Sequence, residues 1–346
     1  MNAEQRNGID KFPEYLWWTG VKKILDSRFT IDGGDELRER MRGLQCNSAD
    51  KRREDQSTAV LFLRDGGANM WHSLMEIYSY YQSMDTLAMA VDKHGQPYFD
   101  RQKDTNDYQV IWVDDKGPGP YHKVWNMFSS KPAVHLEEID TSRTCFDRVI
   151  IPLPGGANTM WEGDWRIHTC KNSTMLDVFQ RRVLDYFRIP EPDKFHPFTV
   201  SFIDRKQTRS LHNQALYLEK LRAKYPRITF KTFDLQEVDL EEQLRIVRET
   251  NVLVGTHGAG LTSTWFLPPR SSVVEILPPD FLHKGFRNLA HIMGHRFFSA
   301  HGTKHEGEGE GWRNPPLFVE EDRFMRLMDM AIGSQWNSGV RNEDAV

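Results

Sequence analysis

The sequence predicts an α/β protein made of two domains, each with a parallel sheet covered by helices. Short apolar runs alternate with segments of helical periodicity, as βαβ units require. Several of these runs continue without polar alternation, which is typical of strands buried on both faces. The length of 346 residues also exceeds what one hydrophobic core usually serves.

The first half predicts four strands and one long helix. In chain order these are a strand at 57–65, a helix at 70–90, and strands at 108–115, 133–139 and 145–153. The helix is predicted because Leu74, Ile77, Tyr81 and Met84 recur with a period of 3.6 residues. We therefore predict an N-terminal domain over residues 1–190.

The second half alternates more regularly and follows a proline cluster at 188–198, which predicts a linker. We predict a C-terminal domain over residues 196–346. Its strands are expected at 198–203, 228–235, 251–256, 272–277 and 295–300, and its helices at 213–225, 239–250, 283–293 and 320–332. Two Rossmann-like halves in tandem bind ligands at the carboxyl ends of their strands, so we expect a central cleft between them.

The composition excludes several classes of function. Hydrophobic residues make up 39% of the chain and the formal net charge is −4, so binding to nucleic acid through phosphate neutralisation is not expected. No apolar run approaches the ~20 residues that span a bilayer. The polar start, MNAEQRNGID, contains no signal-peptide h-region, so the chain as given is expected to lack a signal or anchor.

The first candidate site is a glycine-rich loop, VGTHGAG, between two apolar strands. Gly258 and Gly260 allow backbone N–H groups to face an anion at the start of the next helix. The alternative is a tight turn with His257 in the core. Glu275 favours the binding site, because a carboxylate in a buried strand is costly unless it is paired, and a ribose diol could pair it.

The second candidate site is the segment DRKQTR, which directly follows a predicted strand. Arg205, Lys206 and Arg209 lie where ligands bind in α/β sheets, and arginine pairs well with phosphate oxygens. A solvated basic turn is the alternative. The predicted position beside the glycine loop favours a diphosphate site.

The third candidate site is the start of the long helix, NMWHSLME. His72 and Glu76 are four residues apart and therefore share one helix face, with Asn69 near the helix start. A histidine beside a carboxylate can act as a general base. An ordinary i,i+4 pair is the alternative.

The three cysteines, Cys46, Cys145 and Cys170, have no metal-ligand spacing. We expect a Cys145–Cys170 disulfide if the protein matures in an oxidising compartment. The chain also contains no Asp-x-Asp triplet, and basic side chains could neutralise a diphosphate leaving group, so no divalent metal and no cofactor are expected.

Taken in this order, NMWHSLME, DRKQTR and GTHGAGLTSTWFLPPRSSVVEI resemble glycosyltransferase family 61, over about residues 61–332. The resemblance implies a GT-B fold and an inverting transfer of a sugar, GlcNAc or xylose, from a UDP-sugar donor to a hydroxyl of a glycan or glycoprotein acceptor. It also implies a setting in the Golgi or endoplasmic reticulum lumen.

The resemblance also implies a role for each candidate residue. The first domain would face the acceptor through Asn69, His72 and Glu76, with His72 as base and Glu76 orienting it, although Glu76 as base stays open. The second domain would hold the donor. Its diphosphate would be bound by the basic residues Arg205, Lys206 and Arg209 and by the loop residues His257, Gly258, Ala259 and Gly260. Its ribose would be bound by Glu275.

Two other functions are weighed against this one. A hydrolase that uses HGAG as an oxyanion hole would need a G-x-S-x-G nucleophile elbow, and the sequence contains none. A nucleotide-sugar-binding protein that has lost catalysis would have the same motifs, and the sequence leaves that alternative open.

Overall fold

The computed structural model describes Gly20 and residues 23–24, 54–100, 108–128, 131–140, 144–193, 195–206, 208–303 and 316–337. The contacts divide the chain into two compact units, Met1–Glu162 and Gly163–Val346. This division lies earlier than the proline-rich segment, because helix α8 (Thr174–Tyr186), which we did not predict, packs on the C-terminal unit. Trp265 Nε1, for example, donates a hydrogen bond of 3.2 Å to the Leu176 carbonyl oxygen.

The N-terminal unit contains a four-stranded parallel sheet in the order β3-β2-β1-β4. Its strands are β1 (Glu54–Phe62), β2 (Tyr108–Trp112), β3 (Val134–His135) and β4 (Thr144–Ile150), and its long helix is α4 (Met70–Met89). Short turns of helix complete it: α6 (His122–Trp125), η1 (Asn126–Phe128), η2 (Leu136–Glu138), η3 (Gly155–Ala157) and α7 (Thr159–Glu162). The strand predicted at 133–139 is shorter because η2 begins after His135.

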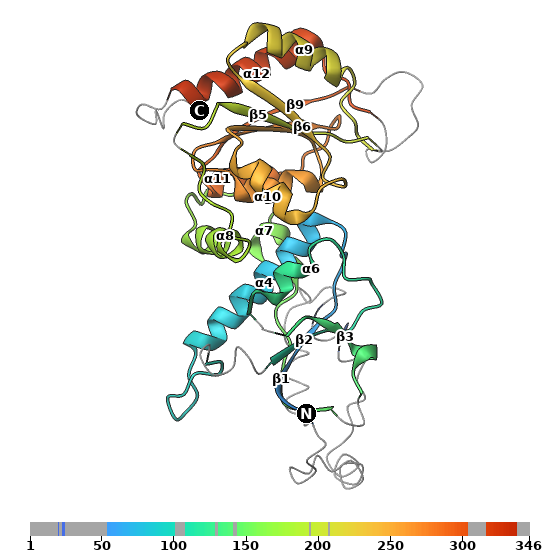
Figure 1. Cartoon of the computed structure of the whole chain (residues 1–346), viewed down its shortest axis with the longest axis vertical. Helices are drawn as coiled ribbons and strands as arrows, with labels where there is room; N and C mark the ends of the chain where they lie inside the picture. Colours follow the sequence, from blue (N-terminus) through green and yellow to red (C-terminus); the bar gives the residue numbers. More distant parts are fainter. Residues whose placement is uncertain are drawn as a thin grey trace. The chain divides into compact units, whose positions relative to one another are not determined.

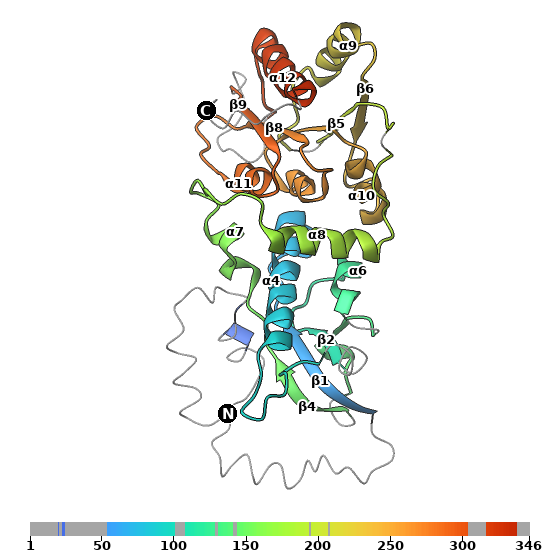
Figure 2. The same ribbon diagram turned by 90° about the vertical axis from the view of Figure 1, so that its left-hand side faces the viewer.

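Alternating side chains of β1 and β2 build the two faces of this sheet. Leu61 and Ile111 are paired in register and belong to one apolar cluster. On the other face, the Tyr80 ring of α4 lies 5.0 Å from Phe62, and its hydroxyl is 2.8 Å from the hydroxyl of Tyr108. Helix α4 therefore covers one face, and Figure 2 shows it running along the strands.

The C-terminal unit contains a five-stranded parallel sheet in the order β6-β5-β7-β8-β9. The strands are β5 (Thr199–Ile203), β6 (Thr229–Phe233), β7 (Val252–Thr256), β8 (Ser272–Leu277) and β9 (Arg296–His301). The helices besides α8 are α9 (Gln214–Lys224), α10 (Leu240–Arg248), η4 (Ala259–Phe266), α11 (Gly285–Ile292) and α12 (Glu321–Trp336). Each strand and helix predicted here is present, and Asp239 caps α10 through the Glu242 N–H.

Helices cover both faces of this second sheet. Helices α9 and α12 lie on one face and α10 and α11 on the other (Figure 1). The α9 and α12 side forms one large core cluster, in which Tyr217 and Phe324 stack at 4.6 Å over β5. The predicted α/β class with two parallel sheets is confirmed, as expected for the two Rossmann-like domains of a GT-B fold.

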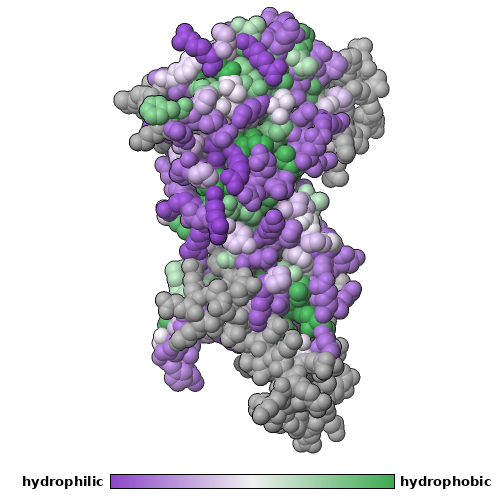
Figure 3. All heavy atoms as spheres, viewed as in Figure 1, coloured by the Kyte–Doolittle hydropathy of each residue, from purple (hydrophilic) through white to green (hydrophobic). Residues whose placement is uncertain are grey.

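Figure 3 shows one face of the molecule, coloured by hydropathy. On the face drawn in Figure 3, hydrophilic side chains predominate and apolar ones are scattered among them. Among the described residues, no helix combines the length and apolarity that a transmembrane span requires. Cys170 is an exposed free thiol, so the structure does not contain the expected disulfide; Cys46 and the side chain of Cys145 lie outside what is described.

Candidate functional site

The strand order of the C-terminal unit marks one position where ligands bind. The chain leaves β5 to form β6 on one side and later returns to form β7 on the other. In such sheets the ligand lies at the carboxyl ends of the two strands where the order reverses. Arg205 follows β5 by two residues and Gly258 follows β7 by two, so both flank this switch point.

The Arg205 guanidinium lies directly against Gly258. Its Nη1 donates to the His257 carbonyl oxygen at 3.3 Å, and its Nε and Nη2 donate to the carbonyl and hydroxyl oxygens of Thr208 at 3.0 and 2.8 Å. A Cβ atom added to Gly258 would overlap Nη1. Because φ is +155° there, a region that only glycine adopts readily, both the backbone and the neighbour require glycine.

Arg209 reaches the same glycine. Its Nη2 atom would lie 3.3 Å from the Cβ added at Gly258. Its backbone has a φ of +52°, a left-handed conformation that costs a non-glycine residue of order 1 kcal/mol. Two guanidinium groups therefore meet where η4 begins, and the first N–H groups of a helix have no partner inside it. The arrangement can hold a diphosphate.

His257 and Glu275 form a buried pair beneath this loop. His257 Nδ1 lies 2.6 Å from Glu275 Oε1, and the Glu275 side chain is 1% exposed. Burial raises the pKa of Glu275 to about 8. Burial, followed by Coulombic interactions with His283, Arg209 and Arg205, lowers the pKa of His257 to about 2. Both shifts favour the neutral form of the pair, and the carboxyl group predicted to bind a ribose is bonded to the loop histidine.

The remaining predicted donor residues lie around this centre. Lys206 pairs on the surface with Glu237 and lies 3.7 Å from Asp234. Gly260 faces apolar neighbours, because a Cβ there would lie 2.6 Å from Leu235. Ala259 is the first residue of η4. Donor contacts of Lys206, Ala259 and Gly260 stay predictions.

In the N-terminal unit, α4 begins where the sequence predicts. Asn69 is its N-cap, and its side-chain oxygen accepts a hydrogen bond of 3.3 Å from the His72 N–H. The His72 ring lies 4.4 Å from the Trp161 ring and is 33% exposed. A partly exposed imidazole at a helix start can exchange protons with a substrate.

The carboxylate that contacts His72 is Asp65, which the sequence analysis missed. His72 Nδ1 is bonded to Asp65 Oδ2. The expectation that Glu76 orients the imidazole is wrong, because Glu76 turns into the protein and its Oε1 accepts a hydrogen bond of 2.6 Å from the Asp65 N–H. Residues four apart share a helix face, but their side chains can still extend in different directions.

The Glu76 carboxyl group is buried, and its burial determines its protonation. A Cβ added at Gly155 would lie 2.7 Å from the Glu76 Cγ, so this glycine lets η3 close over the carboxyl group. Glu76 lines a cavity of about 10 Å³ formed mostly by apolar residues of β1 and 152–155. Burial raises the pKa of Glu76 to about 8, and the neighbouring Asp65 charge adds to this. The carboxyl group is therefore mostly protonated at pH 7.

We expect Glu76→Gln to stabilise the protein increasingly as the pH rises from 5 to 8. The folded chain keeps the Glu76 proton up to about pH 8, whereas the unfolded chain loses it near pH 4.5, so the wild-type free energy of unfolding falls by ~1.4 kcal/mol per pH unit in this window. Urea unfolding at pH 5.5 and 8.0 measures the difference. Exposed Glu137→Gln is the control, and a pH-independent gain in Glu76→Gln would contradict the assignment.

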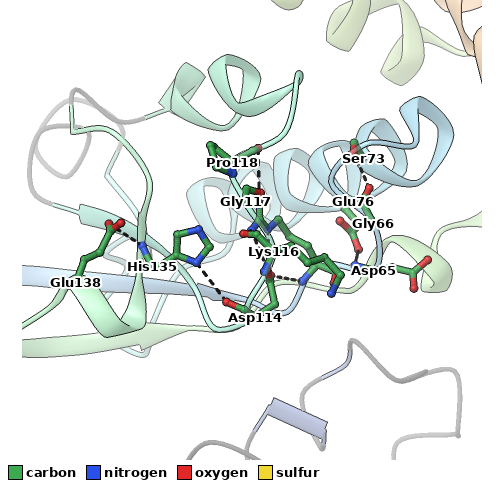
Figure 4. Close-up of polar contacts among 11 residues, drawn as sticks. Asp65, Gly66, Ser73, Glu76, Asp114, Lys116, Gly117, Pro118, His135 and Glu138 are labelled. Atoms are coloured by element: carbon green, nitrogen blue, oxygen red, sulfur yellow. Dashed lines mark hydrogen bonds and ion pairs between the residues drawn. The ribbon is translucent and has the colours of Figure 1, made fainter. Parts of the chain in front are cut away.

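Buried Arg64 connects the loop after β1, which carries Asp65, to the loop after β2 through hydrogen bonds. Its Nη2 lies 2.7 Å from Asp114 Oδ1 and donates to the Lys116 carbonyl oxygen at 2.6 Å, and its Nη1 donates to the Gly117 carbonyl oxygen at 3.1 Å. Burial opposes the charge on Asp114, but bonds and charge from Arg64 outweigh it and lower the Asp114 pKa. Figure 4 shows Asp114, Lys116, Gly117 and Pro118 gathered in this network beside Asp65 and Glu76.

Sequence signals for the missed residues were present but weak. Asp65 and Asp114 each stand just after an apolar strand, where parallel strands bring side chains together at one sheet edge. Within the described residues, no cluster of three or more His, Cys, Asp or Glu side chains is arranged to hold a metal ion.

The chain is similar in sequence to known proteins. Residues 162–274 match the family model Glycosyltransferase 61. The EGF domain-specific O-linked N-acetylglucosamine transferase of Drosophila melanogaster is 26% identical over 240 residues, covering 67% of this chain and 43% of the relative. The Pan troglodytes transferase of the same name is 28% identical over 224 residues, covering 61% of this chain and 39% of the relative. The Mus musculus transferase is 25% identical over 271 residues, covering 75% of this chain and 45% of the relative. The chain thus spans less than half the length of these relatives, and it is similar to glycosyltransferase family 61 over residues 162–274.

Proposed function

We propose that the chain transfers a sugar from a UDP-sugar donor to a hydroxyl group of a protein or glycan, with inversion at the anomeric carbon. The observation that carries this proposal is the meeting of Arg205 and Arg209 with Gly258, at the start of η4 and at the switch point of the sheet. Two guanidinium groups with a helix start suit the diphosphate of a nucleotide sugar.

The names of the relatives support a choice of donor sugar to test first. Their names assign them the transfer of N-acetylglucosamine to EGF domains. On this basis GlcNAc is the first donor sugar to test and xylose the second, with a glycoprotein or glycan as acceptor. We also propose that the protein acts in the lumen of the Golgi or endoplasmic reticulum, which localisation of the tagged full-length protein tests.

In the proposed step one bond forms, one bond breaks and one proton is transferred. The acceptor oxygen forms a bond to the anomeric carbon as the bond from that carbon to the UDP oxygen breaks. The hydroxyl proton passes to His72 as general base, and UDP leaves with the bonding electron pair. Arg205 and Arg209 neutralise its developing negative charge, which is why we propose that no divalent metal is needed.

A donor screen tests this function. Purified chain is incubated with UDP-GlcNAc, UDP-xylose, UDP-galactose or UDP-arabinose, with and without a folded EGF domain, and UDP release is measured with and without EDTA. We expect one donor to be consumed, faster with acceptor and equally fast in EDTA. Heat-denatured chain gives the background. UDP binding without donor consumption would identify a nucleotide-sugar-binding protein that has lost catalysis, and activity restored only by manganese would contradict the metal-free step.

A further inference from the structure

The backbone around Asp65 is held from three sides. The Arg64 N–H donates to Asp114 Oδ2 at 2.9 Å, the Asp65 N–H donates to Glu76 Oε1 at 2.6 Å, and the Gly66 carbonyl oxygen accepts from the Ser73 hydroxyl at 3.0 Å. These three partners come from the loop after β2 and from the first two turns of α4 (Figure 4). Three consecutive residues are thus bonded to separate positions, so the loop that carries Asp65 is rigidly placed.

The orientation of the His72 ring is also fixed by its neighbours. Its Nδ1 atom contacts Asp65 Oδ2, and its ring lies against Trp161 at an interplanar angle of 59°. The backbone of His72 is fixed by the Asn69 cap at the helix start. The ring therefore has one nitrogen committed to Asp65, while 33% of the side chain stays exposed.

The contact determines which ring nitrogen can act as a base. An ionised carboxylate only accepts hydrogen bonds, so Nδ1 must carry the hydrogen, and the lone pair of neutral His72 is then on Nε2. We propose that Asp65 is a positioning residue that holds His72 as the Nδ1–H tautomer. This inference rests on the proposed function, in which His72 takes the acceptor proton.

In the transfer step, the proton of the acceptor hydroxyl passes to Nε2 while the Nδ1–H bond to Asp65 is kept. The ring becomes a cation, and the adjacent carboxylate stabilises it without itself taking the proton. Glu76 has a different role from the one its spacing predicts. Its neutral carboxyl group fixes the Asp65 backbone, and the negative charge beside the imidazole belongs to Asp65.

The tautomer can be observed directly. In chain labelled with ¹⁵N in the histidine rings, long-range ¹H–¹⁵N spectra distinguish Nδ1–H from Nε2–H, and the signal missing in His72→Gln identifies residue 72. We expect Nδ1–H in the wild-type protein. We expect Nε2–H in Asp65→Ala, and Nδ1–H again in Asp65→Glu. A wild-type Nε2–H tautomer would overturn the proposal even if every Asp65 variant failed to fold.

Turnover separates this inference from the proposed function. We expect Asp65→Asn to lower kcat by roughly tenfold to 10⁴-fold, the upper figure being the loss when the carboxylate of a Ser-His-Asp triad is replaced, with UDP affinity retained. Asp115→Asn makes the same change at an exposed position and should keep wild-type turnover. A lost tautomer with normal kcat would support the Asp65 contact but refute His72 as the base. An unchanged tautomer in folded Asp65→Ala would refute the contact.

Discussion

Replacing His72 by alanine is expected to lower kcat by about 10²–10⁴-fold, the usual contribution of general-base catalysis. The substitution removes the only group in the proposed step that accepts the acceptor proton, so the attacking oxygen must lose that proton to water instead. Arg205 and Arg209, which we propose to hold the diphosphate, belong to the C-terminal unit, so UDP affinity is expected to be unchanged. Turnover measured with the donor found in the screen, together with calorimetry of UDP binding, tests both halves of this expectation.

A matched histidine provides the control. His94 is exposed in the turn after α4, and His94→Ala should turn over at the wild-type rate. Circular dichroism shows whether each variant is folded. A folded His72→Ala protein with near-normal kcat would remove His72 from the base role. A parallel loss of UDP affinity would show a structural effect instead.

In the N-terminal unit, local patterns predicted the helix but not the partner of its histidine. The period of 3.6 residues placed α4 correctly, and Asn69 is the N-cap from which His72 follows by three residues. The error concerned Glu76, because spacing describes Cβ positions and says nothing about what closes over a side chain. Gly155, 79 residues further along, allows η3 to bury that carboxyl group, and Asp65 takes its place beside the ring.

In the C-terminal unit, the sequence identified the two segments that meet at the switch point. Arg205 and Gly258 both follow buried strands, and their adjacency depends on β5 and β7 being neighbours, which the alternating pattern favours without proving. The pairing of Glu275 with His257 was harder to predict from the sequence. The register that sets Glu275 beside Gly255 lies outside local periodicity, although the cost of burying a lone carboxylate did indicate that a partner must exist.

The second large effect is expected from Gly258→Ala, which should weaken UDP binding by roughly 10²–10⁴-fold. The added methyl group would overlap Arg205 Nη1 and crowd Arg209 Nη2, so both guanidinium groups must move away from the start of η4. Hydrogen bonds to charged groups contribute about 1.5–3 kcal/mol each, and losing two gives the stated range. Arg205→Ala removes one of them and should cost about ten- to a hundredfold.

Gly333→Ala is the matched control for this glycine. It makes the same change in α12 of the same unit, where nothing lies within 4 Å of the added Cβ, and it should leave UDP affinity unchanged. Calorimetry with UDP on folded protein compares the three variants. The Gly258→Ala variant is expected to bind UDP more weakly than the Arg205→Ala variant, because the added methyl group displaces two cations whereas Arg205→Ala removes one. If Gly258→Ala binds UDP as tightly as Gly333→Ala, the diphosphate does not lie at this loop, and the donor site must be sought elsewhere along the sheet edge.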